Sequence, residues 1–153
     1  DPGGGRLMAD SVTFTLSGRE AFDRVLAQKG RNVAKRTARR AITKASRMLV
    51  RAIKANVRIV LKEKTGSLLR SIKMRVRTFA ASGNTIGIVG AARPEGSHAV
   101  FHEFGTGPRK TKKGYSRGAV PARPIVRPAF DANKDEALRI IAEEIRKELA
   151  RPT

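Results

Sequence analysis

The chain has 153 residues, a length that suits one domain, and 40% of them are apolar, so it can bury a real hydrophobic core. Its formal net charge of +20 favours a polyanion, an acidic protein surface or an assembled partner, because an isolated subunit repels itself. The absence of cysteine excludes disulfides, thiol catalysis and thiolate metal sites, and it permits a reducing compartment.

Residues 1–7 (DPGGGRL) are typical of an expression-tag remnant before a natural start at Met8. Residues 8–153 are expected to form a single domain. No stretch approaches the roughly 20 apolar residues of a membrane span, and no segment has the apolar centre of a secretory signal. The sequence therefore predicts no membrane partner.

The first expected elements are a short strand and a short helix. Residues 12–17 alternate between apolar and polar, which predicts a half-buried strand. Ser17 and Glu20 have the spacing of a capping box, and the helix that would follow carries Phe22, Val25 and Leu26. Gly30 interrupts this helix.

Residues 31–62 predict one long helix, because the segment lacks Pro and Gly and is rich in Ala, Lys, Arg and Leu. At about 100° per residue, one arc of about 80° collects eight cations: Arg36, Arg40, Lys44, Arg47, Arg51, Lys54, Arg58 and Lys62. The opposite side is apolar and rich in alanine, so another element can approach it closely: Ala38, Ala41, Ile42, Ala45, Met48, Leu49, Ala52, Ile53, Ile59 and Val60.

The eight cations allow three interpretations. They could form a solvated face, contact an acidic neighbouring protein, or contact the DNA backbone. Few aromatic residues lie between them, so reading of bases or stacking on bases is not expected.

Three strands are expected after a break at Thr65-Gly66-Ser67. They cover residues 69–80, 85–91 and 98–104, joined by short turns into an antiparallel meander. In the first strand one face is apolar, formed by Ile72, Met74 and Val76. This face should pack on the alanine-rich side of the long helix. A helix region is expected to begin at Pro124 or at Arg127-Pro128 and to be amphipathic over 131–150, so the prediction is an α+β fold of three or four strands on one long helix.

His98, His102 and Glu103 invite comparison with a metal site. On a strand the two histidines would lie about 13 Å apart, and Glu103 would face the other way, so no metal or cofactor is expected. Glu103 is instead expected to pair with Arg123 or Arg127, or to cap the following turn. Ser67 and Ser71 have no partners that would make a catalytic triad, and the phosphate-loop spacing is absent.

A basic segment follows, in which residues 105–121 are expected to form a loop. Gly105, Gly107, Pro108, Gly114 and Gly118 are expected to break any regular element. The loop contains no acid and carries Arg109, Lys110, Lys112, Lys113 and Arg117. It is either a disordered surface loop or, as we favour, a basic tip that becomes ordered on assembly as a subunit-docking loop.

The segment 121–130 (PARPIVRPAF) repeats Arg-Pro at a spacing of four, in Arg123-Pro124 and Arg127-Pro128. It is either a rigid chain reversal that places the C-terminal helix or an ordered docking edge.

Four pieces of the chain together resemble a known family: residues 65–72 (TGSLLRSI), a Val89-Gly90 strand end, residues 101–106 (FHEFGT) and residues 121–130. In this order they resemble the tail-completion, or head–tail joining, proteins of long-tailed phages and prophages, a group that includes the lambda-type minor tail protein Z. The resemblance covers residues 33–130, with Gly66, Glu103, Gly105, Pro124 and Pro128 in its motifs. His98 stands where the family usually has Tyr, and Glu63-Lys64 stands where many members have Pro.

The resemblance implies a structural virion protein without catalysis, cofactor or small-molecule substrate. It implies a ring, expected to be hexameric, around the DNA passage, with other copies and neighbouring head-completion and tail proteins as partners. The host bacterial cytoplasm would be the place of assembly, and the virion neck or tail end the final location. The alternative is a basic nucleic-acid-binding protein that acts without a phage partner; a small nuclease is disfavoured by the few acid–base residues.

Overall fold

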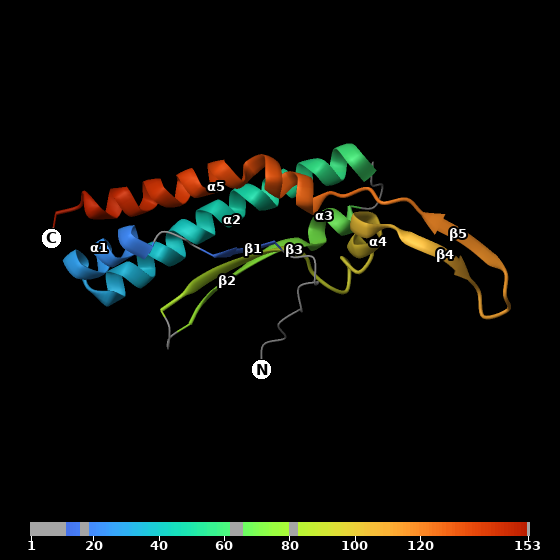
Figure 1. Ribbon diagram of the computed structural model, residues 1–153, viewed down its shortest axis with the longest axis horizontal. Helices are drawn as coiled ribbons and strands as arrows, with labels where there is room; N and C mark the ends of the chain where they lie inside the picture. Colours follow the sequence, from blue (N-terminus) through green and yellow to red (C-terminus); the bar gives the residue numbers. More distant parts are fainter. Residues whose placement is uncertain (1–11, 16–18, 62–65, 80–82, 153) are drawn as a thin grey trace.

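The computed structural model describes residues 12–15, 19–61, 66–79 and 83–152 (Figure 1). The expectations for residues 1–7, for Ser17 and for Lys62 lie outside this part of the chain. The elements in chain order are β1 (Val12–Thr15), α1 (Arg19–Lys29), α2 (Arg31–Leu61), α3 (Ser67–Ser71), β2 (Ile72–Thr78), β3 (Thr85–Ala91), α4 (Ala99–Phe104), β4 (Thr106–Lys110), β5 (Ser116–Val120) and α5 (Val126–Leu149).

The predicted long helix is confirmed as α2, which has 31 residues and a length of about 46 Å. α1 ends at Lys29, directly before Gly30, whose φ of 81° is left-handed and therefore favours glycine. Beyond it α2 runs the length of the molecular body, with α1 packed beside its N-terminal part (Figure 1). α2 is thus the axis on which the other elements are arranged.

The main sheet is antiparallel and three-stranded, with the order β1-β3-β2. Met74 and Val76 of β2 pair with Val89 and Gly87 of β3, and the apolar side chains of β2 face inward. Lys73, Arg75 and Arg77 alternate with them and are exposed, as expected for a sheet with one buried face. The fold is therefore α+β, as predicted, although the third strand is β1 rather than residues 98–104.

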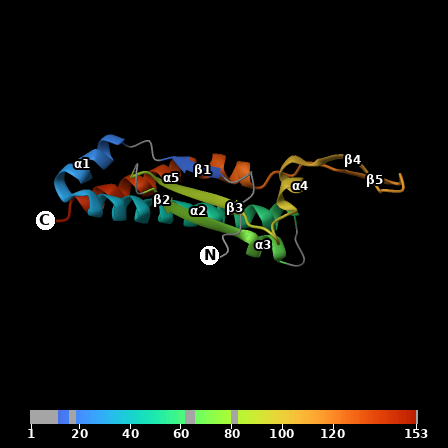
Figure 2. The same cartoon turned by 90° about the horizontal axis from the view of Figure 1, so that it is seen from below.

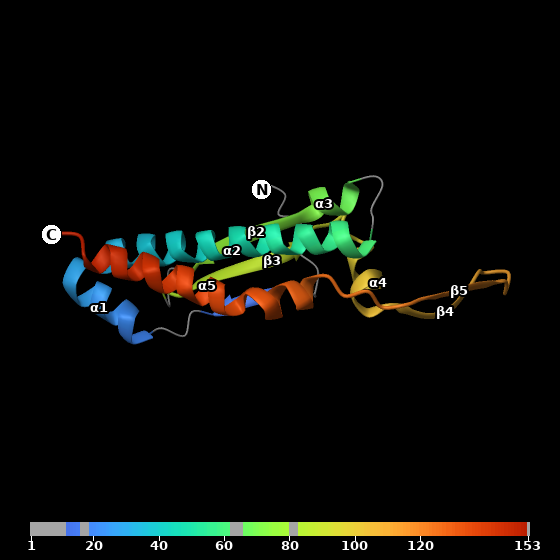
Figure 3. The ribbon, with the colours of Figure 1, turned by 90° about the horizontal axis from the view of Figure 1, so that it is seen from above.

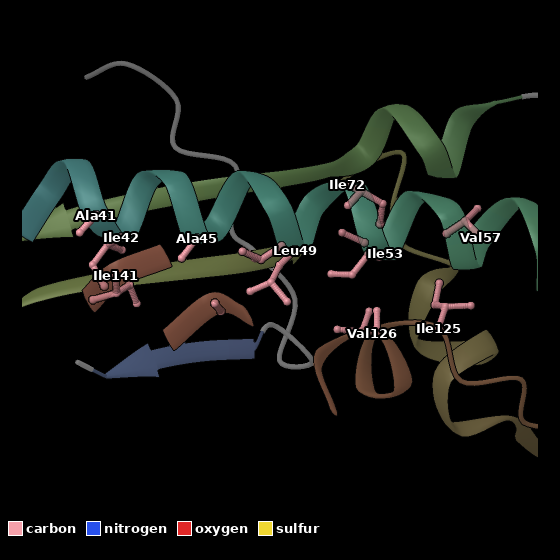
Figure 4. Packing of buried hydrophobic residues seen from close by; sticks show 14 of the residues in the cluster. Ala41, Ile42, Ala45, Leu49, Ile53, Val57, Ile72, Ile125, Val126 and Ile141 are labelled. Atoms are coloured by element: carbon pink, nitrogen blue, oxygen red, sulfur yellow. The ribbon is translucent and has the colours of Figure 1, made fainter. Parts of the chain in front are cut away.

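α2 and α5 lie side by side and cover one face of this sheet (Figure 3). α2 packs on β2 and β3, and α5 reaches β1. The shared core contains Ile42, Leu49, Ile53, Val57, Ile72, Val89, Ile125, Val126, Ile141 and Ile145 (Figure 4). Ala41 and Ala45 are buried between these larger side chains, which confirms the alanine-rich packing face. Ile59, expected on this face, is 74% exposed.

Residues 98–104 were expected to be a strand, and this prediction is wrong. Residues 99–104 form helix α4, because the buried side chains of Ala99 and Glu103 are four residues apart, the spacing of one helical face. The expected strand 69–80 also starts later than predicted: Ser67–Ser71 is the short helix α3, which begins after Gly66, and β2 starts at Ile72. The strand expected at 85–91 is confirmed as β3.

The expected loop 105–121 is also corrected, since it contains the hairpin of β4 and β5. Gly114 (φ 85°) and Gly118 (φ 65°) adopt left-handed conformations inside the hairpin rather than ending it. The pairing is irregular, with shifts on both sides of Arg109. The hairpin projects from the end of the body that is opposite the C-terminus (Figures 1 and 2).

Candidate assembly and polyanion-contact surfaces

The predicted cationic face of α2 is divided by its contacts with α5. Arg40 donates to Glu144 at 3.0 Å and to Glu148 at 2.6 Å, and Lys44 contacts Glu144 at 2.5 Å. Lys44 lowers the pKa of Glu144, and Arg40 lowers the pKa of Glu148, in each case against the opposing effect of burial. Two of the eight predicted contact residues are therefore engaged in ion pairs with α5, although the Lys44 side chain remains 48% exposed.

The other cations of this face that the structure describes are available to a partner. Arg36, Arg47, Arg51 and Arg58 are exposed and Lys54 is half-buried. Between α2 and β2 lies an open groove of about 640 Å³, lined by Arg47, Val50, Arg51, Lys73 and Met74. A smaller groove of about 290 Å³ lies between α2 and α5, where Glu143 and Glu144 add negative charge. The cationic character of α2 is thus partly cancelled on its α5 side.

Glu103 has a specific structural role at the start of α5. Its carboxylate accepts hydrogen bonds from the backbone N–H groups of Ile125 (2.8 Å), Val126 (2.9 Å) and Arg127 (3.0 Å). The next residue, Pro128, has no N–H, so the unpaired donors of the first turn are all accounted for. A carboxylate at this position also interacts favourably with the helix dipole. Glu103 was expected to cap the turn that directly follows it; the structure shows instead that it caps the start of α5, more than twenty residues later.

The alternative expectation for Glu103, an ion pair with Arg123 or Arg127, is not what the structure shows. No ion pair of the described residues joins Glu103 to either arginine, and both arginines are exposed. Arg123 uses its backbone N–H to donate to the carbonyl oxygen of His102 at 2.6 Å. The expected start of the C-terminal helix near Pro124 or Arg127 is confirmed by α5, with Ile125 as N-cap.

The expected separation of about 13 Å between His98 and His102 is wrong, because it assumed a strand. His98 is the N-cap of α4 and His102 lies four residues later in that helix, so the two share a helix side. Within the described part of the chain, no group of three or more His, Asp or Glu side chains is placed to hold a metal ion. The Ser71 hydroxyl donates to the carbonyl oxygen of Leu68 at 2.7 Å and is buried.

The β4–β5 hairpin, residues 106–120, is called the basic arm below. It carries all five cations that were expected in the loop, and each of them is exposed: Arg109, Lys110, Lys112, Lys113 and Arg117. Tyr115 near the turn is 71% exposed. The strands pair with each other, and the arm makes little contact with the body (Figure 1).

A second surface lies at the base of the arm and is called the docking patch below. It consists of Phe101, which is 42% exposed, Phe104, which is 63% exposed, and the exposed residues 121–124. The two parts are held together because Arg123 donates to His102 of α4. Exposed phenylalanines next to a rigid proline segment are typical of a protein–protein contact site.

At the base of the basic arm, the backbone at Gly105 lies very close to the backbone of Val120 and Ala122. Its φ is 71°, and a Cβ atom at this position would lie 2.7 Å from the carbonyl oxygen of Val120 and 2.8 Å from the nitrogen of Ala122. Only glycine fits both conditions. Gly105 therefore allows the chain to enter the arm and leave it at nearly the same point.

Sequence reasoning missed the two glutamates of α5 and the two phenylalanines of the docking patch. A signal for the glutamates was present, since Glu144 and Glu148 are four residues apart and adjoin the apolar stripe of Ile141 and Ile145. For Phe101 and Phe104 the signal was lost when 98–104 was interpreted as a strand.

No helix in the described part of the chain is both long enough and apolar enough to span a membrane. A sequence model of the family described as "Bacteriophage HK97-gp10, putative tail-component" matches residues 20–105, which is more than half of the chain. No curated protein and no solved structure matches it. The matched region runs from α1 to the glycine at the base of the basic arm.

Proposed function

Because the chain belongs to the HK97-gp10-like family of bacteriophage tail components, we propose that it is a tail-completion or head–tail joining subunit that forms a ring. The number of copies is six, following the resemblance to tail-completion proteins, and the ring surrounds the DNA passage. Its role is structural and involves no catalysis. Assembly takes place in the host cytoplasm, and the finished protein is located at the virion neck or tail end.

The observation that carries the proposal is the docking patch. Large apolar side chains on a monomer surface are unfavourable in water, and phenylalanine is a frequent anchor of protein interfaces. Phe104 remains 63% exposed in the described chain. The neighbouring subunit would cover Phe104 with a surface other than its own docking patch. Such a head-to-tail contact between two different surfaces generates a ring.

Residues 121–124 provide the polar rim of the same contact. Pro121 and Pro124 fix the backbone, so little conformational entropy is lost on docking. Arg123 and Arg127 are both exposed, and each can donate to acidic or carbonyl groups of a neighbour. We assign the docking role of residues 121–130 to Arg123 and to Arg127, which lies in the first turn of α5.

The test is the mass of the protein in solution as a function of concentration, measured by light scattering after size exclusion. We expect a concentration-dependent oligomer, and we expect Phe104→Ser to weaken it. An anchor contribution of about 2 kcal/mol corresponds to a roughly 30-fold higher dissociation constant. Phe79→Ser is the matched control, because Phe79 is also half-exposed, at 45%, but lies at the far end of β2.

Two results would contradict the proposal. One is a 16.7 kDa monomer at every concentration, also in the presence of tail-tube subunits. The other is a genome in which no portal, capsid or tail-tube genes adjoin this one. For the arginines, the double variant Arg123→Ala/Arg127→Ala should fold normally but fail to join tails; intact joining would remove their docking role.

The alternative function, a basic nucleic-acid-binding protein without a phage partner, is favoured by the net charge of +20 and the exposed basic arm. It predicts a monomer that binds DNA tightly with a steep salt dependence and does not purify with tail proteins.

A further inference from the structure

The basic arm is the strongest local concentration of uncompensated charge in the described chain. Five cations lie within residues 109–117, and the sequence contains no acid between Glu103 and Asp131. Glu103 is buried, and its carboxylate is occupied by the amides of α5. The arm projects away from the body (Figure 2), and none of the ion pairs among the described residues includes one of its five cations.

A second copy of the arm is a poor partner for this surface. Two arms would bring ten cations together, and like charges on neighbouring strands are destabilising. Pro108 in β4 has no N–H to donate to an added strand. Cationic side chains and proline at a strand edge are devices by which proteins prevent pairing between edges. The arm is therefore unsuited to strand pairing between identical subunits.

An apolar protein surface is also a poor partner. The strands consist of Thr, Gly, Pro, Ser, Ala and cations, with Val120 at the base as the only larger aliphatic residue. Protein interfaces are depleted in Lys and bury a core of aromatic or aliphatic anchors, and here Tyr115 is the one candidate anchor. An isolated two-stranded hairpin is also marginally stable in water, so a bound partner should stabilise it. Because the strands lack apolar anchors, that partner must bind mainly through charge.

We propose that the basic arm binds the phosphate backbone of duplex DNA without sequence preference. A two-stranded ribbon is narrow enough to enter the major groove, and protein–DNA interfaces are polar and strongly positive, as the arm is. The long side chains of Arg109, Lys110, Lys112, Lys113 and Arg117 can reach phosphates on either side of the ribbon. This reassigns the five cations from subunit docking to DNA, and it does not depend on ring formation.

The cationic face of α2 provides the comparison within the same molecule. Arg40 and Lys44 are paired with Glu144 and Glu148. The remaining cations, from Arg36 to Arg58, extend along about 33 Å of helix, whereas those of the arm lie within nine residues. The local positive potential should therefore be higher at the arm, and DNA should contact the arm first.

The experiment measures the affinity of the protein for a fluorescently labelled 30-base-pair duplex of mixed sequence between 50 and 300 mM salt. One variant has all five cations of the arm changed to Ser. The matched control has five cations of α2 changed to Ser: Arg36, Arg47, Arg51, Lys54 and Arg58. Both variants lower the net charge by five, so any difference between them reports position rather than total charge.

Each phosphate contact contributes about 0.9 to the slope of log K against log salt. If three to five contacts are lost, the slope of the arm variant should fall by about 2.7 to 4.5, while that of the α2 variant should change by less than one. Equal losses in the two variants would overturn the proposal, because they would indicate attraction by net charge alone. Wild-type binding by the arm variant would also overturn it.

An acidic protein partner is separated from DNA by competition. Polyglutamate at the same concentration of charges should displace the duplex poorly; equal displacement would mean that the arm recognises acidic protein, and the DNA assignment would be wrong. The thermal melting of both variants is measured first: the arm variant should match the wild type because its substituted side chains are exposed, and the α2 variant should melt somewhat lower, because serine is a weaker helix former than lysine or arginine, but remain folded at the assay temperature. Ring formation is followed separately by mass, so the failure of one proposal is distinguishable from the failure of the other.

Discussion

Replacing Glu103 with Ala should destabilise the protein more than replacing Glu95, the acidic residue in the turn before α4. The carboxylate accepts three backbone N–H groups at 2.8, 2.9 and 3.0 Å, and its residue is only 9% exposed. It connects α4 to the first turn of α5, across the insertion of the basic arm. Its loss therefore removes both a helix cap and a tertiary contact.

The magnitude follows from the burial of the donors. Ile125 and Val126 are 0% and 4% exposed, so their N–H groups would be left without water, at a cost of about 1 kcal/mol or more each. Arg127 is exposed, so water can replace its bond. Loss of the favourable charge at the helix start adds about 0.5 kcal/mol. The sum is about 2.5 kcal/mol, which corresponds to a decrease in melting temperature of roughly 5 to 10 °C for a domain of this size.

The assay is thermal unfolding followed by circular dichroism, with urea unfolding to obtain the free energy. Glu103→Gln retains one acceptor oxygen and should lose about half as much, since its NH₂ group cannot accept a bond. Glu95→Ala is the control: Glu95 is exposed in the turn before α4, and its removal should stay within about 0.5 kcal/mol. A melting temperature for Glu103→Ala within 2 °C of the wild type would refute the reasoning.

Two further predictions concern the body. The pKa values of Glu144 and Glu148 are lowered from 4.5, so their ion pairs stabilise the fold fully above that pH and lose this effect as the pH falls through the lowered values. The urea midpoint should therefore drop between about pH 5 and pH 3, and Glu144→Gln/Glu148→Gln should flatten this drop; equal pH profiles would contradict it. Gly105→Ala should cost about 3 kcal/mol or more, because φ 71° with ψ −172° is a conformation essentially restricted to glycine and the added Cβ would also clash with backbone atoms. Gly30→Ala, with φ 81° and nothing within 4 Å of its added Cβ, should cost only about 1 kcal/mol, and equal melting temperatures for the two variants would contradict this reasoning.

The parts of the fold that the sequence predicts well have long or clean periodicity. α2 offers 31 residues without a helix breaker, so its axis and its buried face follow from the pattern alone. β3 is bounded by turn residues on both sides and was predicted with its observed limits. In both cases local preference and tertiary packing agree.

The segment 98–104 shows why short elements are harder to assign. Seven residues can alternate in polarity by chance, and both a strand and a helix of two turns fit them. The decisive fact is that Glu103 must reach the start of α5, and this depends on residues more than twenty positions further along the chain. The residues next to Glu103 in the sequence do not indicate this contact with α5.

The partition of the cationic face was also beyond the sequence. A helical wheel tells which residues of α2 share a side, but not that α5 borders this side at Arg40 and Lys44. The partners are about a hundred residues away in the chain. Only the packing of α5 beside α2 determines which of the cations are free for a partner.

Because of the close approach at Gly105, the length of the basic arm can change without changing the stability of the body. The chain leaves and re-enters the body at one closed point, where Val120 donates to the Thr106 hydroxyl and Arg123 donates to His102. Each pair of residues inserted in the two strands would extend the arm by about 3.3 Å, and lengthening the connection has only a small entropic cost. Subunits with identical bodies could thus be fitted to channels of different width by insertions between residues 107 and 119 alone.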